Sequence, residues 1–562
     1  MKFSQMPYKR PVLEEVRETL GVLIGAFESA PSPEAALEAY RAADAFAAEA
    51  GTMGAIAYIR NTLDTEDEFY NAEIEYIYET EPQLKETTQR LEKALLASLH
   101  RAFLEGEFGS LMFKNIEISL KTFSPEIISE LQQEKKLMHA YNKLIASAQI
   151  DFDGKTLTLA QLAPYHQSPE REIRYNSMLV RSAWFLANAD ELDGLFDKLV
   201  EVRTAMARKL GYESFTELGY LRMCRNCYDK GMVEKFREGV LRHIVPVASR
   251  LKAEQAARIG VPALTVYDDP YTFRTGNPIP RGDPEKIFAH GREMYRCLSP
   301  ETHEFFEFML ENELFDVLAR KGKSSGGYCY HLTSQKSPFV FANFNGTAGD
   351  IDVLTHEMGH AYAAYAARDI FPSDNQSGTY ETCEVHSMSM EFFAWPWMEG
   401  FFGDQADKYR YSHLSDALTF LPYGAMVDDF QHLVYESPGM TPAQRNECWL
   451  ELEKNYRPYL DLDFPFYGEG RRWQMQAHIF ENPFYYIDYC LAQTVALSFL
   501  AADAQNHGDA WARYQKFISY AGKKTFTELV DAAGLRSPFE PDALAVVSAA
   551  AVKWLENAPK VE

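Results

Sequence analysis

Two histidines four residues apart, His356 and His360, stand on either side of Glu357 in the segment I-D-V-L-T-H-E-M-G-H at residues 351–360. In a helix, side chains at positions i and i+4 share one face, with Cβ atoms roughly 5 to 6 Å apart, so both imidazoles can bind one metal ion. The glutamate then lies beside the metal, where it can act as a general base toward water. The 14 His and 81 acidic residues among 562 predict only about 0.05 such matches by chance. The pattern therefore indicates a hydrolytic Zn²⁺ site.

The residues that precede this motif suit an extended peptide ligand. Residues 338–344, P-F-V-F-A-N-F, predict a short strand, and residues 345–350 predict a turn that leads into the helix. An exposed strand edge can hold an extended peptide by main-chain pairing. The alternative interpretation is a helix whose two histidines are buried in a core and hydrogen-bonded there. The flanking segments do not support this alternative.

A catalytic zinc site needs a third protein ligand and one open position for water. The polar, turn-rich residues 372–378 allow a second helix to fold back on the first. That second helix offers four candidate ligands: Glu381, Glu384, His386 and Glu391. Spacing alone leaves all four open, because a single glutamate on a helix face is usually an ordinary surface charge.

A second group of candidates lies near the C-terminus, where His478 precedes Tyr485, Tyr486 and Tyr489. Hydrolysis of a peptide places negative charge on the carbonyl oxygen, and a histidine or tyrosine hydroxyl beside the metal can donate hydrogen bonds to it. An aromatic run at helical spacing is more often part of a core, and the chain has 32 tyrosines. The residues by themselves leave both interpretations open.

Three segments together resemble the thimet-oligopeptidase superfamily of zinc oligopeptidases, most closely its bacterial oligoendopeptidase F and Pz-peptidase branch. They are T-H-E-M-G-H-A at residues 355–361, C-E-V-H-S-M-S-M-E-F-F at residues 383–393, and the His-x-x-x-x-Pro-Phe-Tyr-Tyr-x-x-Tyr run at residues 478–489. The resemblance is strong from about residue 200 onward and weak before it.

The resemblance implies a role for each matching residue of the first two segments. The family's third ligand is the first Glu of an E-x-x-S-M block, which is Glu384 in this chain. His356, His360 and Glu384 are therefore expected to bind one Zn²⁺ per chain, while Glu357 activates the water.

In the third segment, His478, Tyr486 and Tyr489 match a His and a Tyr-x-x-Tyr pair that face the scissile carbonyl in the family. The spacing differs by one residue from the animal branch, which leaves open whether Tyr485 or Tyr486 takes the first tyrosine role. A zinc-bound imidazole usually has a hydrogen-bond partner for its other nitrogen. The candidates for that partner are Asp352, Glu381 and Glu391.

Composition excludes several other classes of protein. The seven cysteines are scattered and odd in number, so we expect no disulfide framework and a reducing cytoplasm. Cys224 and Cys227 form a single C-x-x-C pair, which we interpret as two buried, inert thiols. The N-terminus has no apolar signal region, and no run of about 18 apolar residues predicts a membrane span. The net charge of 56 − 81 = −25 disfavours binding to nucleic acid or anionic membranes.

Helix signals dominate the chain. A capping residue followed by Pro and Glu, which favours a helix start, recurs at residues 32–34, 124–126, 168–170, 283–285 and 299–301. Long amphipathic stretches follow, for example at residues 66–108 and 169–210. Strand signals are few: a hairpin closed by Asp-Gly at residues 150–159, and residues 328–330 with 338–344 as a small sheet beside the metal helix.

We therefore predict a mainly α protein with a small β-sheet beside the zinc helix. The resemblance adds an N-terminal helical lobe (residues 1–200) and a catalytic domain (residues 201–562) that enclose a substrate channel. The expected function is that of a cytoplasmic zinc oligoendopeptidase for short unstructured peptides. Two alternatives are a helical zinc carboxypeptidase with the same His-Glu-x-x-His motif and a non-catalytic peptide-binding protein. Binding alone would not need Glu357.

Overall fold

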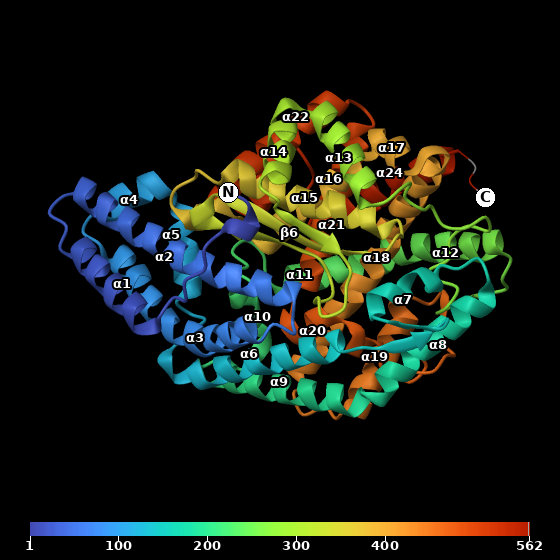
Figure 1. Cartoon of the computed structure of the whole chain (residues 1–562), viewed down its shortest axis with the longest axis horizontal. Coiled ribbons are helices and arrows are strands. Elements are labelled where there is room, and N and C mark those ends of the chain that lie inside the picture. The colour runs from blue at the N-terminus through green and yellow to red at the C-terminus, as the bar shows by residue number, and fades with distance from the viewer. Residues whose placement is uncertain (560, 562) are drawn as a thin grey trace.

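Helices make up most of the computed structural model, which describes residues 1–559 and 561 (Figure 1). The mainly α prediction is thus confirmed. The first helices are α1 (Leu13–Glu28), α2 (Pro33–Leu63), α3 (Glu68–Ala97), α4 (Arg101–Phe108), α5 (Ser110–Ser119), α6 (Ile128–Ala146), α7 (Leu159–His166), α8 (Arg171–Ala187) and α9 (Ala189–Lys209). The next are α10 (Phe215–Arg222), α11 (Lys230–Gly239), α12 (Val245–Ile259), α13 (Pro284–Leu298), α14 (Pro300–Glu311), α15 (Gly349–Ala367), α16 (Tyr380–Phe393) and α17 (Met398–Phe402). The last are α18 (Ala406–Glu436), α19 (Pro442–Tyr456), α20 (Ala477–Glu481), α21 (Tyr486–Asp503), α22 (His507–Ser519), α23 (Phe526–Ala532) and α24 (Ala543–Asn557).

Several predicted helix starts are confirmed by their caps. Ser32, Asp283 and Ser299 each accept a hydrogen bond from a backbone N–H of the first turn, at 3.2, 3.0 and 3.2 Å. The helix start predicted at residues 168–170 is present as the start of α8 at Arg171, but Ser168 is not its cap, because its hydroxyl accepts from the N–H of Glu170 (3.2 Å) in a local turn.

Both long amphipathic stretches are interrupted, each at a residue whose side chain bonds locally. Ser98 accepts a hydrogen bond from the N–H of His100 (3.1 Å), which separates α3 from α4. Asn188 donates to the carbonyl of Trp184 (2.7 Å), and its backbone leaves the helical region between α8 and α9. Such side-chain bonds compete with the helix ladder.

The predicted hairpin is present as β1 (Ile150–Phe152) and β2 (Lys155–Leu157), which pair antiparallel. Asp153 and Gly154 have φ values of 52° and 70°, the left-handed conformations that an Asp-Gly hairpin turn requires. A second, two-stranded sheet pairs β3 (Leu264–Thr265) with β7 (Leu460–Asp461).

A three-stranded sheet packs on α15, as predicted. Its order is β4 (Phe315–Leu318), β6 (Ser337–Phe344) and β5 (Tyr328–Leu332), with β6 in the middle. The strand β4, which pairs parallel to β6, was not predicted from the sequence. Among the described residues, β6 is the one strand that pairs with β5, so the other side of β5 is a strand edge.

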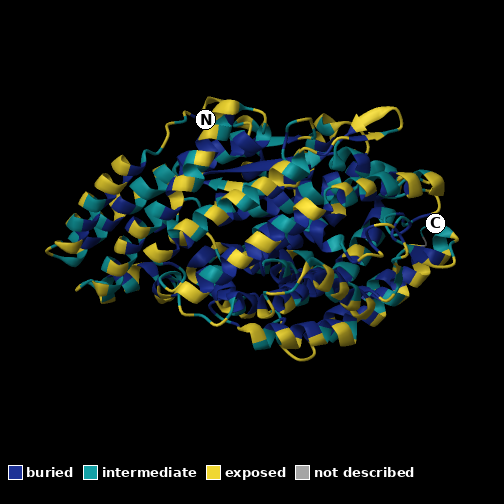
Figure 2. Cartoon of the chain, turned by 90° about the horizontal axis from the view of Figure 1, so that it is seen from below, coloured by how far each residue is buried: buried dark blue, intermediate teal, exposed yellow. Residues whose placement is uncertain are grey.

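The main core surrounds α15, α16, α18 and α21, which Figure 1 shows near the middle of the molecule. Figure 2 shows that buried residues concentrate in the interior of the molecule, while the helices at its periphery expose their outward faces. The helices α1 to α5 share a smaller separate core, which includes Phe27, Tyr40, Leu104 and Phe113.

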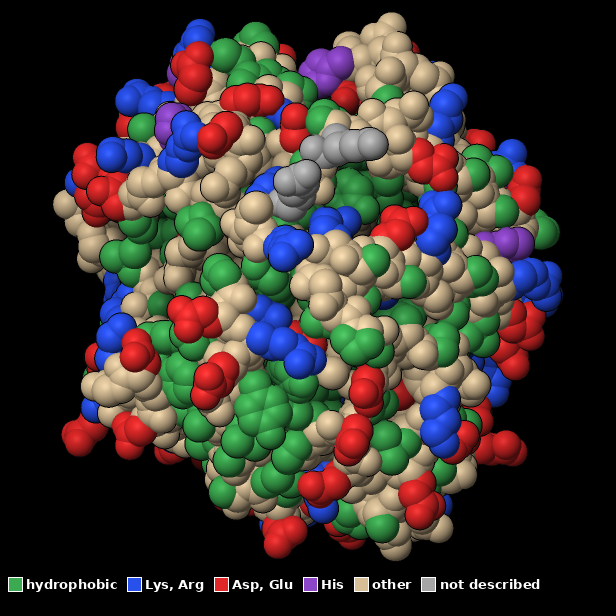
Figure 3. All heavy atoms as spheres, turned by 90° about the vertical axis from the view of Figure 1, so that its right-hand side faces the viewer, with side chains coloured by type: hydrophobic (Ala, Val, Ile, Leu, Met, Phe, Trp, Pro, Cys, Tyr) green, Lys and Arg blue, Asp and Glu red, His purple; other side chains and the backbone are tan. Residues whose placement is uncertain are grey.

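The surface and the cysteines agree with the compositional analysis. Figure 3 shows acidic and basic side chains intermingled over the face that lies at the right of Figure 1. The seven cysteines are free thiols, and Cys224 and Cys227 are half-buried rather than fully buried as expected. Within the described part of the chain, every helix is too short or too polar to cross a membrane.

Candidate active site

Two adjacent helices, α15 and α16, bring the candidate metal ligands together. His356 and His360 lie on one face of α15, as their spacing predicts. Gly359 between them allows the close contact with α16, since a Cβ at this position would lie 2.6 Å from the carbonyl oxygen of His386 and from the Cα of Ser387. The backbone of α15 therefore packs directly against the backbone of α16 next to the candidate ligands.

The ligand atoms of His356, His360 and Glu384 all lie within 4.8 Å of one another. One carboxylate oxygen of Glu384 is 3.2 Å from Nε2 of His356 and 3.4 Å from Nε2 of His360. Burial opposes ionisation of Glu384, but the two imidazoles outweigh it and hold its pKa well below the usual value. Two imidazoles and one ionised carboxylate form the donor set of a catalytic zinc site, so these residues fit the expected metal.

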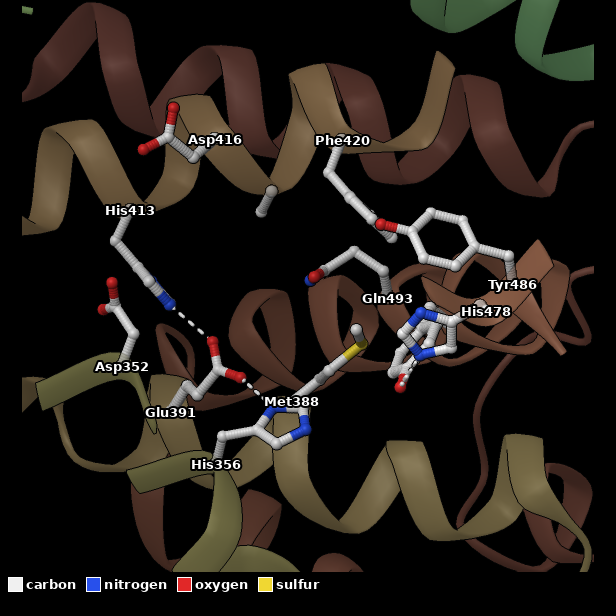
Figure 4. Close-up of a pocket in the computed structure, with 12 residues that line it drawn as sticks. Asp352, His356, Met388, Glu391, His413, Asp416, Phe420, His478, Tyr486 and Gln493 are labelled. Atoms are coloured by element: carbon white, nitrogen blue, oxygen red, sulfur yellow. Dashed lines mark hydrogen bonds and ion pairs between the residues drawn. The ribbon is translucent and has the colours of Figure 1, made fainter. Parts of the chain in front are cut away.

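The remaining nitrogen of His356 has a defined partner. Its Nδ1 is 2.7 Å from Glu391, whose other oxygen is 2.7 Å from Nε2 of His413, and Figure 4 shows Glu391 between the two rings. Trp395 in turn donates from its indole N–H to Nδ1 of His413 (3.2 Å). This chain of bonds fixes the His356 ring with Nε2 directed at the metal position.

The other two candidate partners have different contacts. Asp352 accepts a hydrogen bond from the hydroxyl of Tyr409 (2.7 Å), and Glu381 accepts one from Thr379. The role of His413 was missed in the sequence, because this residue lies 22 positions beyond Glu391 on another helix, α18. Its sequence neighbours carry no motif that would identify it.

Glu357 is 6% exposed and follows the candidate ligand His356 on α15, with its carboxylate beside the segment that leads into β5. A Cβ placed on Gly327, just before β5, would be 3.3 Å from Oε1 of Glu357. The other oxygen, Oε2, has no hydrogen-bond partner within the described residues, and burial raises the pKa of the carboxyl. This carboxylate is free to accept a proton from a molecule bound at the metal position.

His478 and Tyr489 meet on the opposite side of the site. Nε2 of His478 is 3.2 Å from the hydroxyl oxygen of Tyr489, and Gln476 donates an amide hydrogen to Nδ1 (2.9 Å). Burial lowers the pKa of His478 to about 4, so the ring is neutral at pH 7. Because Nδ1 accepts, the neutral ring carries its proton on Nε2, the nitrogen that faces the site.

The two neighbouring tyrosines point to different partners. The hydroxyl of Tyr485 donates to Glu384, whereas the ring of Tyr486 packs against Phe420 at 5.7 Å between ring centroids. Tyr486 and Tyr489 line a cavity of about 330 Å³ beside His356. Both tyrosines thus reach the site, Tyr485 at a ligand and Tyr486 at the cavity wall.

A buried turn sets the angle between α20, which carries His478, and α21. Its central residue, Phe484, has φ = 69°, a left-handed conformation that is unusual for a large side chain. Its N–H donates to Gln431 (2.8 Å), and its carbonyl accepts from Arg225. A Cβ on Gly219 would lie 2.5 Å from the Phe484 ring, so the ring fits in this place only because residue 219 is a glycine.

Comparison with known proteins places this architecture in a family. Residues 3–123 match the model of the peptidase M3 N-terminal domain, and residues 299–547 match peptidase family M3. The structure of PZ peptidase A with an inhibitor is 46% identical, with a TM-score of 0.98 and 99% of each chain covered.

Two further proteins carry the name oligoendopeptidase F. A structure from Bacillus anthracis, provisionally given that name, is 44% identical over 99% of this chain and 98% of its own, with a TM-score of 0.93. An oligoendopeptidase F homolog from Borreliella burgdorferi is 22% identical over 227 residues, which are 38% of this chain and 37% of that protein.

Proposed function

The chain belongs to peptidase family M3 and is a metalloendopeptidase, and on that premise we propose that it cleaves internal bonds of short, unstructured peptides with one zinc ion per chain. The observation that carries the proposal is the group of His356, His360 and Glu384, whose ligand atoms lie within 4.8 Å of one another beside Glu357. These are the three ligands and the general base that zinc-dependent hydrolysis requires.

When bound, zinc supplies a Lewis acid that polarises the scissile carbonyl and makes a water molecule more acidic. Glu357 accepts the proton of the attacking water and then passes it to the leaving amine. Its unpartnered oxygen and its position next to the sheet edge support this role. Glu391 and His413 keep His356 oriented throughout.

His478 and the tyrosines act on the carbonyl oxygen. The proton on Nε2 of His478 and the hydroxyl of Tyr489 are donors placed next to each other, which suits the stabilisation of negative charge. Tyr486 lines the same cavity. Tyr485, which donates to Glu384, can instead hold that ligand in position.

We infer that an internal channel restricts the substrates to short peptides. Tyr330 of β5 is 41% exposed and Tyr380 is 46% exposed, so both side chains keep one side open to solvent. Tyr58 of α2 packs at 5.8 Å from Tyr330, which brings the N-terminal helices next to this edge strand. These contacts support the N-terminal helices as one wall of the channel.

We assign that wall to an N-terminal lobe, residues 1–200, and the metal site to a catalytic domain, residues 201–562. An extended peptide advances roughly 3.3 Å per residue and can thread between them, whereas a compact domain cannot. The free cysteines fit a cytoplasmic location. The net charge of −25 favours peptides over nucleic acid or anionic membranes as partners.

Metal analysis combined with cleavage mapping of peptides blocked at both ends tests the proposal. We expect about one zinc per chain, internal cleavage, and reversible inactivation by a chelator. A zinc carboxypeptidase would need a free C-terminus, and a non-catalytic binding protein would cleave none of the peptides. Either of these results would overturn the proposal.

A further inference from the structure

The cavity beside His356 contains an acidic residue that hydrolysis does not use. Asp416 lies on α18, one turn beyond His413, and lines this cavity of about 330 Å³ together with residues of the active site. In Figure 4 its carboxylate lies at the edge of the group, beyond the His413 ring and directed away from Glu391. The side chain is exposed to solvent and also lines the cavity, so a ligand in the cavity can reach it.

The charged groups around Asp416 already have partners of their own. Glu391 is engaged by two histidines, and Asp352 accepts from Tyr409. Lys252, which also influences Asp416, is 2.8 Å from Asp269. Among the residues that the structure describes, the carboxylate of Asp416 forms neither a hydrogen bond nor an ion pair with another side chain, unlike the carboxylates of Asp352 and Glu391 in the same cavity wall.

The wall of this cavity is partly apolar. Met388, Ala417 and Phe420 line the cavity together with the amide of Gln493. An apolar wall that ends in a solvated carboxylate fits a side chain with an aliphatic stem and a cationic head. Such a side chain can bury its stem while its charged head stays in contact with water. Lysine and arginine have this form. Glutamate would be repelled by Asp416, and a purely apolar side chain would leave the carboxylate unpaired.

We propose that this cavity is a substrate subsite that binds a lysine or arginine side chain next to the scissile bond, with Asp416 pairing with the cationic head. The inference rests on the proposed peptidase function and adds the substrate class to it. The subsite shares His356, His478 and Tyr489 with the active site, so the cationic residue occupies one of the two positions that flank the cleaved bond.

The test uses the full-length zinc enzyme and blocked peptides that differ at one flanking position, with lysine, norleucine or glutamate there. Both flanking positions are varied in turn. At low salt, the kcat/KM of wild type for the lysine peptide should be about tenfold above that for the norleucine peptide. This ratio lies between the small effect of an exposed ion pair and the larger effect of a buried one. Because the pair is open to solvent, this preference should shrink as salt is added.

Two variants and a control make the assignment specific. Asp416→Asn should bring the lysine to norleucine ratio close to one, and Asp416→Lys should favour the glutamate peptide. Glu436→Gln changes the net charge by the same amount as Asp416→Asn, but it lies 20 residues farther along α18, about 30 Å away along the axis. This control should retain the ratio of wild type.

The outcomes separate the subsite from the function on which it rests. If wild type cleaves no blocked peptide, the proposed function fails. If wild type cleaves peptides but the ratio is near one at both positions, or if Asp416→Asn keeps the ratio of wild type, the subsite is wrong while the peptidase stands. A ratio that falls equally in Glu436→Gln would also overturn it, since overall charge would then be the cause.

Discussion

The two sides of the active site are built in different ways. On the metal side, the ligands belong to α15 and α16, two regular helices in backbone contact at Gly359. On the donor side, His478 lies on the short helix α20 and Tyr489 on α21, and the turn at Phe484 separates them. The metal side thus depends on local helix geometry, whereas the donor side depends on long-range contacts that hold an irregular turn.

This difference teaches which parts of the chemistry tolerate change. The metal ligands and Glu357 have fixed positions, so each substitution there removes one function completely. The donors on the other side overlap, because His478 and Tyr489 lie together, with ring centroids 5.5 Å apart. We therefore expect loss of metal or base to have the largest effects and loss of one donor to have a smaller effect.

The largest effect should follow from loss of a metal ligand. His356→Ala, His360→Ala and Glu384→Ala should each lose zinc and reduce activity to background, since three ligands are the minimum for this site. Glu391→Ala removes only a supporting hydrogen bond and should weaken zinc affinity by about 10 to 100-fold. Competition with a chromophoric chelator measures the zinc affinity of the ligand variants and of Glu391→Ala.

Glu381→Ala is the matched control for these ligand variants, because Glu381 is on the same helix but accepts a hydrogen bond from Thr379 and lies outside the group of candidate ligands. It should keep zinc affinity close to that of wild type. If Glu381→Ala removes the metal and Glu384→Ala retains it, the assignment of the third ligand is wrong.

Glu357→Gln should separate metal binding from catalysis. The amide cannot accept the proton of water, while the three ligands are unchanged, so we expect full zinc content with activity reduced by about 10² to 10⁴-fold. Zinc analysis and kcat/KM on one blocked peptide measure the two quantities. Full zinc content together with activity within about tenfold of wild type would remove Glu357 from the role of base.

The donor side should respond mainly in kcat. His478→Ala and Tyr489→Phe remove hydrogen-bond donors that act in the transition state, so each should reduce kcat by about 10² to 10³-fold with a smaller change in KM. Tyr486→Phe is a useful comparison, since its ring packs on Phe420 in the cavity wall. A change in KM alone for His478→Ala and Tyr489→Phe would make these residues substrate-binding groups instead.

A substitution at Gly359, where α15 contacts α16, should have the smallest effect on catalysis and a clear effect on stability. Gly359→Ala places a methyl group 2.6 Å from the backbone of α16, which should destabilise the fold by about 1 to 3 kcal/mol and weaken zinc binding as Glu384 shifts. Gly54→Ala in α2 is the control, because a Cβ there meets nothing within 4 Å. Thermal unfolding should show a lower midpoint for the first variant and an unchanged or higher one for the second.

Sequence reasoning predicted correctly the positions that follow from helix periodicity. The spacing of His356 and His360 sufficed to place them on one face, and the strand and turn before them predicted the sheet beside α15. Choosing Glu384 among its helical neighbours required the family resemblance. The strand β4 was missed because its parallel partner β6 lies more than 20 residues away and its four residues carry no turn signal.

What the sequence could not provide was the arrangement between distant segments. Glu391 is the partner of His356 because His413, from α18, engages its other oxygen. The different directions of Tyr485 and Tyr486 depend on the turn at Phe484, which Gln431 and Arg225 hold from other helices. Such contacts are set by tertiary packing, which leaves no local pattern.

The left-handed turn at Phe484 also has an evolutionary consequence. Its ring fills the space above Gly219, so any side chain at 219 is excluded while phenylalanine remains at 484. The two positions, 265 residues apart, therefore form an epistatic pair: a larger residue at 219 becomes acceptable only after 484 has become smaller. Either order of substitution passes through an intermediate that either clashes or leaves a void beside the turn between α20 and α21. We therefore expect neutral drift at this pair to be slow.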